Sequence, residues 1–357
     1  MPVQAYMARC LYDPEHGYYR RRPAIGAAGD FVTAPEISQT FGETIGVWTM
    51  LVWRAMGRPE ALQLIELGPG RGTLMDDLLR TLGTFAARGA GIKSLALRLV
   101  ETNATLGALQ RGRLAARIDA DPAVTATWHE TIDSLPADGG PTIVIANEFV
   151  DCLPVRQLVR TEAGLAERCV GLGADGRLRF VAGSPVSRAE AAAAGFPAAV
   201  LAGALADGAV IEARPDLPPL LARLATHAPL AGLVIDYGHS ESAAGDTLQA
   251  VRRHRFADPL EEPGLADLTA QVDFASLARD AAEAGLAVEG PMAQGPFLMA
   301  LGIGIRAERL MHSADAPTAN MIETAVARLV DPAAMGVRFK VLGLRSPELP
   351  PLAPFGP

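Results

Sequence analysis

The stretch over residues 63–75, Q-L-I-E-L-G-P-G-R-G-T-L-M, constrains the fold of this chain more than any other. It opens as a short apolar run, breaks into three glycines within five residues, and resumes with helix formers from Thr73. This order predicts a buried strand over 63–67, a tight turn, and a helix over 73–87. Glycines let the backbone approach a ligand closely, and the free N–H groups at a helix start favour anionic or polar ligand groups. The stretch therefore predicts a nucleotide-type cofactor site.

The glycine spacing separates two classes of cofactor. A dinucleotide fingerprint is G-x-G-x-x-G, whereas in this chain Thr73 holds the place of the last fingerprint glycine. An acidic residue inside the strand, in E-L-G-P-G-x-G, resembles the first motif of S-adenosylmethionine-dependent methyltransferases. We therefore favour S-adenosylmethionine over a nicotinamide dinucleotide; a turn with no ligand is the remaining alternative. The predicted cofactor contacts in this stretch are Glu66, Gly68, Pro69, Gly70, Gly72 and Thr73.

The composition of the chain excludes several classes of protein. Its 357 residues, 49% of them hydrophobic, are ample for a large core. A formal net charge of −8 argues against a nucleic acid bound by bulk electrostatics. The apolar runs are too short to cross a bilayer and no secretory segment is visible, so we expect no membrane insertion and a cytoplasmic location.

Neither the cysteines nor the histidines form a metal-binding pattern. Cys10, Cys152 and Cys169 are scattered and show no C-x-x-C spacing. The six histidines show no pair at i, i+4. We therefore predict no disulfide framework and no metal site.

Strand and helix patterns alternate after the glycine turn. Strands are predicted over 95–100, 124–129, 142–146 and 232–235, with helices over 105–117 and 274–284. This alternation is typical of an α/β fold, a mostly parallel, doubly wound sheet with helices on both faces. Ligands of such sheets bind at the carboxyl ends of the strands. Glu101, His129, Asn147 and Glu148 are predicted to lie there, the first three as cofactor contacts. An acid at the position of Glu101 commonly accepts hydrogen bonds from ribose hydroxyls.

The chain divides into three parts by its patterns. Residues 1–60, which are rich in turn formers and aromatics before an apolar-faced helix over 41–56, are predicted to form an N-terminal arm and lid. On the residues alone, a simple packed arm is an equal alternative. Residues 61–153 and 231–357 are predicted to form the sheet domain, and residues 154–230 an inserted subdomain that shapes a substrate site.

Patterns inside these parts predict further elements. The insertion contains a hairpin about 173–176 and helices over 187–206 and 215–228. The C-terminal part contains helices over 303–312 and 320–329, followed by a strand over 338–342.

Several stretches across the chain match one protein family in order. They are Y-D-P-E-H-G-Y-Y at 12–19, G-D-F-V-T-A-P-E-I-S-Q-T-F-G-E at 29–43, E-L-G-P-G-R-G-T-L at 66–74, A-N-E-F-V-D-C-L-P-V-R-Q at 146–157, D-Y-G at 236–238 and A-D-L-T-A-Q-V-D-F at 266–274. In these the chain resembles the MidA-like proteins, which include the mitochondrial complex I assembly arginine methyltransferase and bacterial relatives. The resemblance covers nearly the whole chain.

The resemblance implies a fold, a cofactor and an activity. It implies a seven-strand, Rossmann-like class I methyltransferase sheet, an inserted substrate subdomain and S-adenosyl-L-methionine as cofactor. It implies symmetric dimethylation of an arginine on a respiratory complex I subunit, in the bacterial cytoplasm or, in a eukaryote, the mitochondrial matrix. With it, residues 29–36 become a lid that brings Phe31 and Thr33 to the cofactor. The chain departs from the family pattern at Phe149, Val150 and Cys152.

Arginine methylation requires carboxylates beside the cofactor. A guanidinium is delocalised and charged, and paired carboxylates can accept its hydrogen bonds and hold its charge away from the attacking nitrogen. Glu148 and Asp151 are the predicted catalytic pair, and Glu36 and His239 are further candidates. We expect Asp236 to be structural and Cys152 to be a small buried residue.

Alternatives to this function remain at the level of sequence. One is a methyltransferase acting on a small molecule, and another is a non-catalytic assembly factor that retains a cofactor site. The main interpretation implies a protein substrate, and a homodimer is compatible with it.

Overall fold

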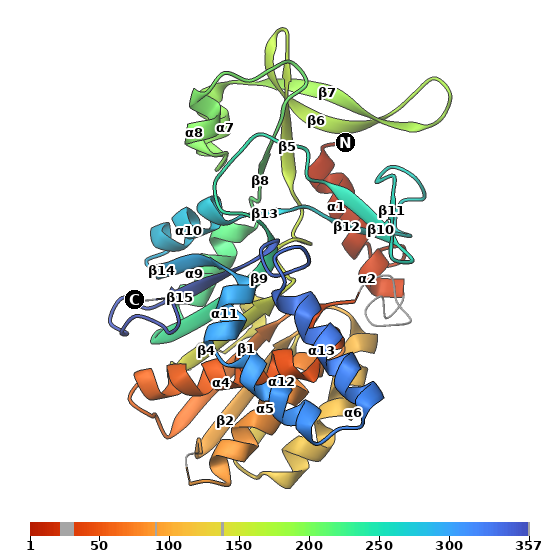
Figure 1. Cartoon of the computed structure of the whole chain (residues 1–357). Coiled ribbons are helices and arrows are strands. Elements are labelled where there is room, and N and C mark those ends of the chain that lie inside the picture. Colours follow the sequence, from red (N-terminus) through yellow and green to blue (C-terminus); the bar gives the residue numbers. More distant parts are fainter. Residues whose placement is uncertain (22–31, 90, 137–138, 356–357) are drawn as a thin grey trace.

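A central sheet organises the computed structural model, which describes residues 1–21, 32–89, 91–136 and 139–355 (Figure 1). Its seven main strands are hydrogen-bonded in the order β14, β15, β9, β4, β1, β2, β3. Their bounds are β1 Ala61–Leu67, β2 Ser94–Val100, β3 Val124–His129, β4 Thr142–Asn147, β9 Leu230–His239, β14 Ala287–Ala293 and β15 Phe339–Arg345. A short strand, β13 (Val272–Asp273), pairs with the end of β9. The predicted α/β sheet is confirmed.

The sheet is parallel except at one strand. β1 pairs in parallel with β2 on one side and with β4 on the other, and β9 continues parallel to β4. Only β15 runs antiparallel, between β9 and β14. Because the strand order reverses at β1, a crevice opens at the carboxyl ends of β1 and β4, where ligands of such sheets bind.

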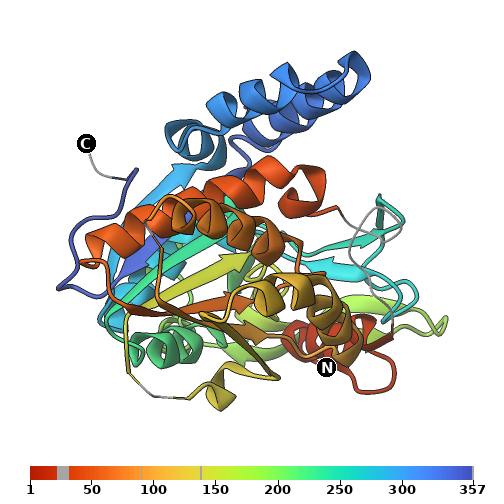
Figure 2. The ribbon, with the colours of Figure 1, turned by 90° about the horizontal axis from the view of Figure 1, so that it is seen from below.

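Helices cover both faces of the sheet because successive residues of the buried strands point to opposite sides. On β1, Leu64 belongs to the core beneath α4 (Gln39–Ala55) and α5 (Thr73–Ala86). Its neighbour Ile65 belongs to the core beneath α9 (Leu217–Ala225) and α10 (Phe274–Glu283). Figure 2 shows α4 and α9 on opposite sides of the strands. Between β2 and β3 lies α6 (Ala104–Ala120), and a short 3-10 turn at Ile132–Ser134 packs against α9.

The segment between β4 and β9 builds a separate antiparallel sheet that projects from the central one (Figure 1). Its strands, in the order β7, β6, β5, β8, are β5 Arg156–Thr161, β6 Gly164–Leu172, β7 Leu178–Val186 and β8 Val210–Ala213. The hairpin predicted about 173–176 is confirmed, with Gly176 at a φ of +76°.

One prediction for this segment is wrong. A single helix over 187–206 was expected, but the chain forms α7 (Arg188–Ala193) and α8 (Ala198–Ala202). Gly195 adopts a φ of +82°, and Pro197 follows it at the cap of α8. A left-handed residue and a proline both interrupt a helix, so the alanine-rich pattern breaks here.

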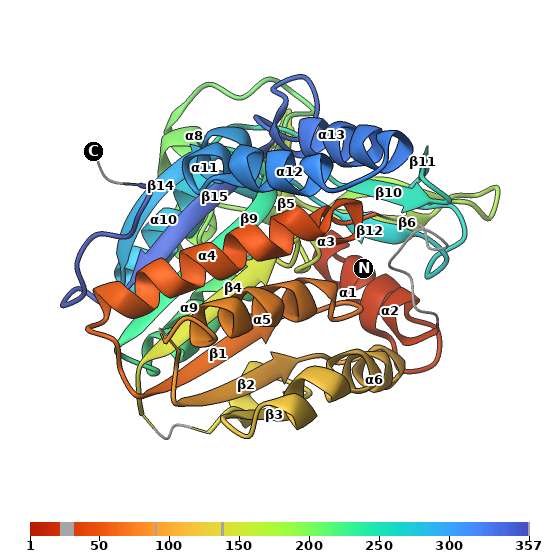
Figure 3. The same cartoon turned by 60° about the horizontal axis from the view of Figure 1, so that its bottom comes forward.

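The N-terminal arm packs on the projecting sheet. α1 (Val3–Tyr12) shares a core with Val155 and Val170 of the insertion and with a three-stranded sheet, in the order β11-β10-β12. The strands of that small sheet are β10 Gln249–Arg252, β11 Arg255–Ala257 and β12 Asp267–Thr269. α2 (Tyr18–Arg21) then turns toward the central sheet (Figure 3). The arm therefore joins the insertion to the cofactor half.

Three helices between β14 and β15 lie over α4 (Figure 3). They are α11 Gln294–Ala300, α12 Ile303–His312 and α13 Ala316–Val330. α13 begins four residues before the predicted start at 320, because the Asp315 carboxylate caps it by accepting the N–H of Thr318 at 2.9 Å. Within the described ranges no helix is long and apolar enough to cross a membrane.

Candidate active site at the carboxyl ends of β1, β2 and β4

The glycine turn connects the end of β1 to the start of α5. Gly68, Gly70 and Gly72 have φ values of +63°, +55° and +75°. L-residues rarely adopt this region, so the turn needs glycine at these points. A Cβ on Gly68 would also lie 3.0 Å from a ring carbon of Phe149, in the loop after β4. The absence of side chains thus lets the β1 turn and the β4 loop approach each other.

Glu66, the acid inside β1, is buried beside this turn. Burial, and then the nearby Glu101 carboxylate, raise the pKa of Glu66 to about 8. Its Oε2 atom is buried without a hydrogen-bond partner among the described residues. A buried carboxyl in that state is costly unless a ligand donates to it, so it fits the polar part of a bound cofactor.

Glu101 follows β2, as predicted, and both of its carboxyl oxygens are hydrogen-bonded. The Asn103 N–H donates to Oε1 at 2.8 Å, and the Gln110 side-chain amide donates to Oε2 at 3.2 Å. Burial raises the pKa of Glu101 to about 7 in spite of these bonds. The carboxyl is therefore fixed in orientation at the strand end where a ribose would lie.

Gln110 is a site residue that sequence reasoning missed. Its side-chain amide donates to the Gly70 carbonyl at 2.7 Å as well as to Glu101, and its oxygen accepts the Trp128 indole N–H at 2.9 Å. It lies fully buried on α6, four residues from both Leu106 and Leu114. A polar residue on the apolar stripe of a helix was the signal that could have found it.

The loop after β4 brings Asn147 and Glu148 to the same crevice. Glu148 has a φ of +51°, and its Oε1 accepts the Ala34 N–H at 2.7 Å and the Asn147 side-chain amide at 3.3 Å. Burial, the largest cause, raises the pKa of Glu148 to about 8, and the neighbouring Asp151 adds to the rise. The Oε2 atom of Glu148 and the Oδ1 atom of Asn147 are buried with no partner in the described ranges.

Asp151 lies three residues further on, in a loop that Asp236 holds. One Asp236 oxygen accepts the N–H groups of Val150 and Asp151 at 3.0 and 3.2 Å, and the other accepts the Tyr237 N–H at 2.9 Å. Burial raises the pKa of Asp151 to about 6, while the Tyr237 hydroxyl and the Arg214 charge favour its ionised form. The Asp151 Oδ1 atom is also buried without a partner in the part of the chain that is described.

Residues 33–36 lie over the glycine turn. The Thr73 hydroxyl donates to the Glu36 carboxylate, and Thr33, Pro35 and Glu36 line a cavity above the turn together with Glu66 and Glu148. Glu36 thus reaches the cofactor side of the crevice. With these residues in place the cavity measures about 40 Å³, close to the roughly 30 Å³ that one water occupies in the liquid. Phe31, predicted to touch the cofactor, lies outside the described residues.

The two predicted histidines lie away from this cavity. His129 ends β3, and its ring nitrogens face the hydroxyls of Thr127 at 2.9 Å and Ser134 at 3.5 Å. Burial is the first cause that lowers its pKa. His239 ends β9 and lines a different cavity, between the insertion and α10. Among the described residues no three His, Cys, Asp or Glu side chains are grouped as metal ligands.

The fold and this site define the class of protein. The sheet is doubly wound and has one antiparallel strand near its edge, with a glycine turn after the central strand and an acid after the next strand. These features fit a site for S-adenosylmethionine. The buried, unpartnered oxygen of Glu66 supports that fit. Known proteins agree. Residues 44–292 match the model of a family described as "Putative S-adenosyl-L-methionine-dependent methyltransferase", and the chain belongs to that family.

Named relatives and solved structures extend the comparison. The chain is 35% identical to "Protein arginine methyltransferase NDUFAF7, mitochondrial" of Xenopus tropicalis, over 99% of this chain and 85% of the relative. It is 34% identical to the Homo sapiens protein of that name, over 96% and 79%. A crystal structure of a COG1565 superfamily member from Burkholderia thailandensis bound to S-adenosyl-homocysteine superposes with a TM-score of 0.82, at 29% identity, over 97% of this chain and 87% of that one. The protein is an S-adenosylmethionine-dependent methyltransferase.

Proposed function

We propose that this protein transfers a methyl group from S-adenosylmethionine to an arginine of a protein substrate. The observation that carries the proposal is a set of three hydrogen-bond acceptors after β4, the Oδ1 of Asn147, the Oε2 of Glu148 and the Oδ1 of Asp151. All three are buried and without a partner among the described residues. A guanidinium brings five N–H donors and a positive charge, and so it satisfies such a set.

The raised pKa values favour a cationic substrate in the same way. Burial raises the pKa of both Glu148 and Asp151, and the Asp151 charge adds to the rise at Glu148. A guanidinium placed between them would lower both pKa values and bind the ionised pair. An uncharged small substrate would leave two buried carboxylates facing each other.

The residues after β4 would then divide the chemistry among themselves. S-adenosylmethionine supplies a methyl group on a positively charged sulfur. Glu148 and Asp151 hold the guanidinium so that one nitrogen points at that methyl group, which converts an encounter of two molecules into an aligned displacement. The methylated nitrogen loses a proton, and the ionised Glu148 carboxylate beside it is suited to accept that proton.

The named relatives support this substrate class. They are called protein arginine methyltransferases, and the chain matches them over nearly its whole length. The resemblance to the MidA-like family extends the proposal to symmetric dimethylation of a complex I subunit. For a eukaryotic host the relatives' names favour a mitochondrial location; for a bacterial host we propose the cytoplasm.

We include a homodimer in the proposal, with Met299, Ile305 and Met321 of α11–α13 as its exposed apolar contact surface. Light scattering of the purified protein tests this. A monomer mass at high protein concentration would rule the dimer out.

Labelling a lysate tests the substrate. A lysate from cells that lack this protein is incubated with the protein and S-adenosylmethionine labelled on the methyl group. We expect one labelled band at the size of a complex I subunit, with the label on methylarginine after hydrolysis. Label on a small molecule would favour the small-molecule alternative. Cofactor binding in a calorimeter with no labelled product would favour a non-catalytic assembly factor.

A further inference from the structure

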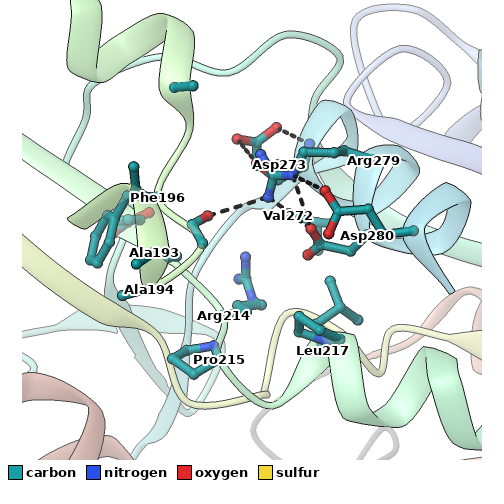
Figure 4. A pocket seen from close by; sticks show the side chains of 18 of the residues that line it. Ala193, Ala194, Phe196, Arg214, Pro215, Leu217, Val272, Asp273, Arg279 and Asp280 are labelled. Atoms are coloured by element: carbon teal, nitrogen blue, oxygen red, sulfur yellow. Dashed lines mark hydrogen bonds and ion pairs between the residues drawn. The ribbon is translucent and has the colours of Figure 1, made fainter. Parts of the chain in front are cut away.

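A cavity of about 610 Å³ lies between the insertion and the start of α10 (Figure 4). This volume lies within the roughly 300–1,000 Å³ of ordinary ligand sites. Ala193, Ala194 and Phe196 stand on its insertion side, and Val272 and Arg279 stand on its sheet side. The small alanines leave the space open. The residues that line the cavity above the glycine turn do not line this one.

Arg279 joins the two walls. Its guanidinium donates to the Gly195 carbonyl of the insertion at 3.2 Å and to the Asp280 carboxylate of its own helix at 2.8 Å. Arg279 therefore bridges the insertion and α10 across the cavity.

One wall of this cavity also supports the catalytic loop. Arg214 points into the cavity from its base (Figure 4) and donates to the carbonyls of Ala270 and Gln271 at 2.5 and 3.0 Å. The Ala270 N–H donates in turn to the carbonyl of Asp151 at 3.0 Å. The segment 270–271 therefore contacts both Arg214 of the cavity and the backbone of Asp151. A peptide with its target arginine at Asp151 could place neighbouring residues in the cavity.

The charges of the lining indicate which residues fit. Four carboxylates, those of Glu212, Asp273, Asp280 and Glu283, line the cavity together with two guanidinium groups, and the two Asp273 oxygens also accept the N–H and the hydroxyl of Ser276 at 3.0 and 2.9 Å. Both guanidinium groups are already hydrogen-bonded to the protein, and Glu283 is 71% exposed with its nearest cation 4.0 Å away. The excess of two negative charges favours a basic residue, and the alanine wall favours an apolar one.

We propose that this cavity binds the segment of the substrate protein next to the target arginine, and that it selects a segment with an apolar side chain beside a basic one. The apolar side chain lies against Ala193 and Ala194, and the basic one meets Glu283 and Asp273. This proposal rests on the proposed function, because it takes the substrate to be a protein arginine.

Binding of short labelled peptides tests the cavity without relying on catalysis. Each peptide has one central arginine and either an apolar–basic or an apolar–acidic flank, and its affinity for the protein saturated with S-adenosyl-homocysteine is measured by fluorescence anisotropy. We expect the basic flank to bind about tenfold more tightly, because the carboxylates of the cavity attract the basic side chain and repel the acidic one, while the apolar side chain is common to both peptides. The preference should persist when lysine replaces the central arginine.

Two pairs of variants locate the effect. Ala193→Trp fills the cavity and should abolish the preference, whereas Ala199→Trp, on the exposed side of α8, should keep it. Glu283→Lys should reverse the preference for charge, whereas Glu308→Lys on the exposed side of α12 should not. Equal or absent binding of both peptides, or a preference that survives Ala193→Trp, would overturn the proposal. A flank preference without methyl transfer to arginine would support the cavity and refute arginine methylation.

Discussion

The acids after β2 and after β4 lie at the same edge of the sheet but differ in their hydrogen bonds. Both oxygens of Glu101, after β2, already accept hydrogen bonds from Asn103 and Gln110. After β4, Glu148 and Asp151 each keep one buried oxygen with no partner among the described residues. The pKa is raised in all three, to about 7, 8 and 6 respectively.

The difference indicates what each side can bind. A carboxylate held by its own protein is fixed in orientation and suits neutral hydroxyl groups, such as those of a ribose. A buried unpaired acceptor is costly, so a carboxylate left unsatisfied needs a ligand that donates to it, and two such carboxylates in one loop, Glu148 and Asp151, need a ligand that also brings positive charge. The β2 side is therefore suited to the cofactor, and the β4 side to a cationic substrate.

Glu148→Gln should have the largest effect. The amide keeps the shape of the side chain but removes the charge that holds the guanidinium, so we expect methyl transfer to an arginine peptide to fall by about 10³-fold. The rate of label transfer from S-adenosylmethionine measures it. Full activity would remove Glu148 from the catalytic pair.

Asp236→Asn should destabilise the β4 side. The carboxylate accepts three backbone N–H groups, and an amide in its place would point donors at donors. We expect a loss of about 2 kcal/mol or more in the free energy of unfolding. Urea denaturation measures it, with Asp119→Asn on the exposed face of α6 as the matched control. An equal, small loss in both variants would contradict the supporting role of Asp236.

Gln110→Met should disturb the β2 side alone. The methionine fills the space but removes the hydrogen-bond partner of the Gly70 carbonyl, of the Glu101 Oε2 atom and of the Trp128 N–H. We expect S-adenosylmethionine to bind about tenfold more weakly. In a substrate-saturation assay the KM for the peptide should be unchanged. A change in peptide KM with unchanged cofactor affinity would reverse the assignment.

The pH dependence of stability tests the side after β4 in the ligand-free protein. The pKa of Glu148 rises from an ordinary 4.5 to about 8 in the folded protein, so between about pH 5 and pH 8 the folded state holds a proton that the unfolded state has lost. The free energy of unfolding of the ligand-free protein should therefore fall as pH rises through this window. Denaturation at several pH values should show a shallower fall for Glu148→Gln. Identical slopes would show that Glu148 ionises normally.

The local sequence was sufficient to predict where the residues of the cofactor side lie. Three glycines, an acid in the strand before them and Glu101 after the next strand are all near neighbours of a regular strand or helix, so periodicity and turn chemistry predict their positions. Gln110 was missed because its partners come from three separate elements, and only the folded chain brings them together.

The other elements could not be predicted fully, because their bounds and packing depend on more than the local pattern. The helix predicted over 187–206 follows the alanine content of the sequence, but Gly195 and Pro197 divide it. The N-terminal arm could be predicted as aromatic and irregular. That its Val3 and Met7 pack against Val155 and Val170 of the insertion depends on contacts more than 100 residues apart in the chain, which no local pattern records.

Cofactor affinity measured side by side in two variants tests the division between the two sides most directly. S-adenosylmethionine is titrated calorimetrically into Glu101→Gln and Glu148→Gln. We expect Glu101→Gln to weaken binding by at least about tenfold, because a carboxylate that accepts from hydroxyls is lost, and Glu148→Gln to stay within about twofold of the unaltered protein. A loss of cofactor affinity in Glu148→Gln as large as in Glu101→Gln would contradict the account.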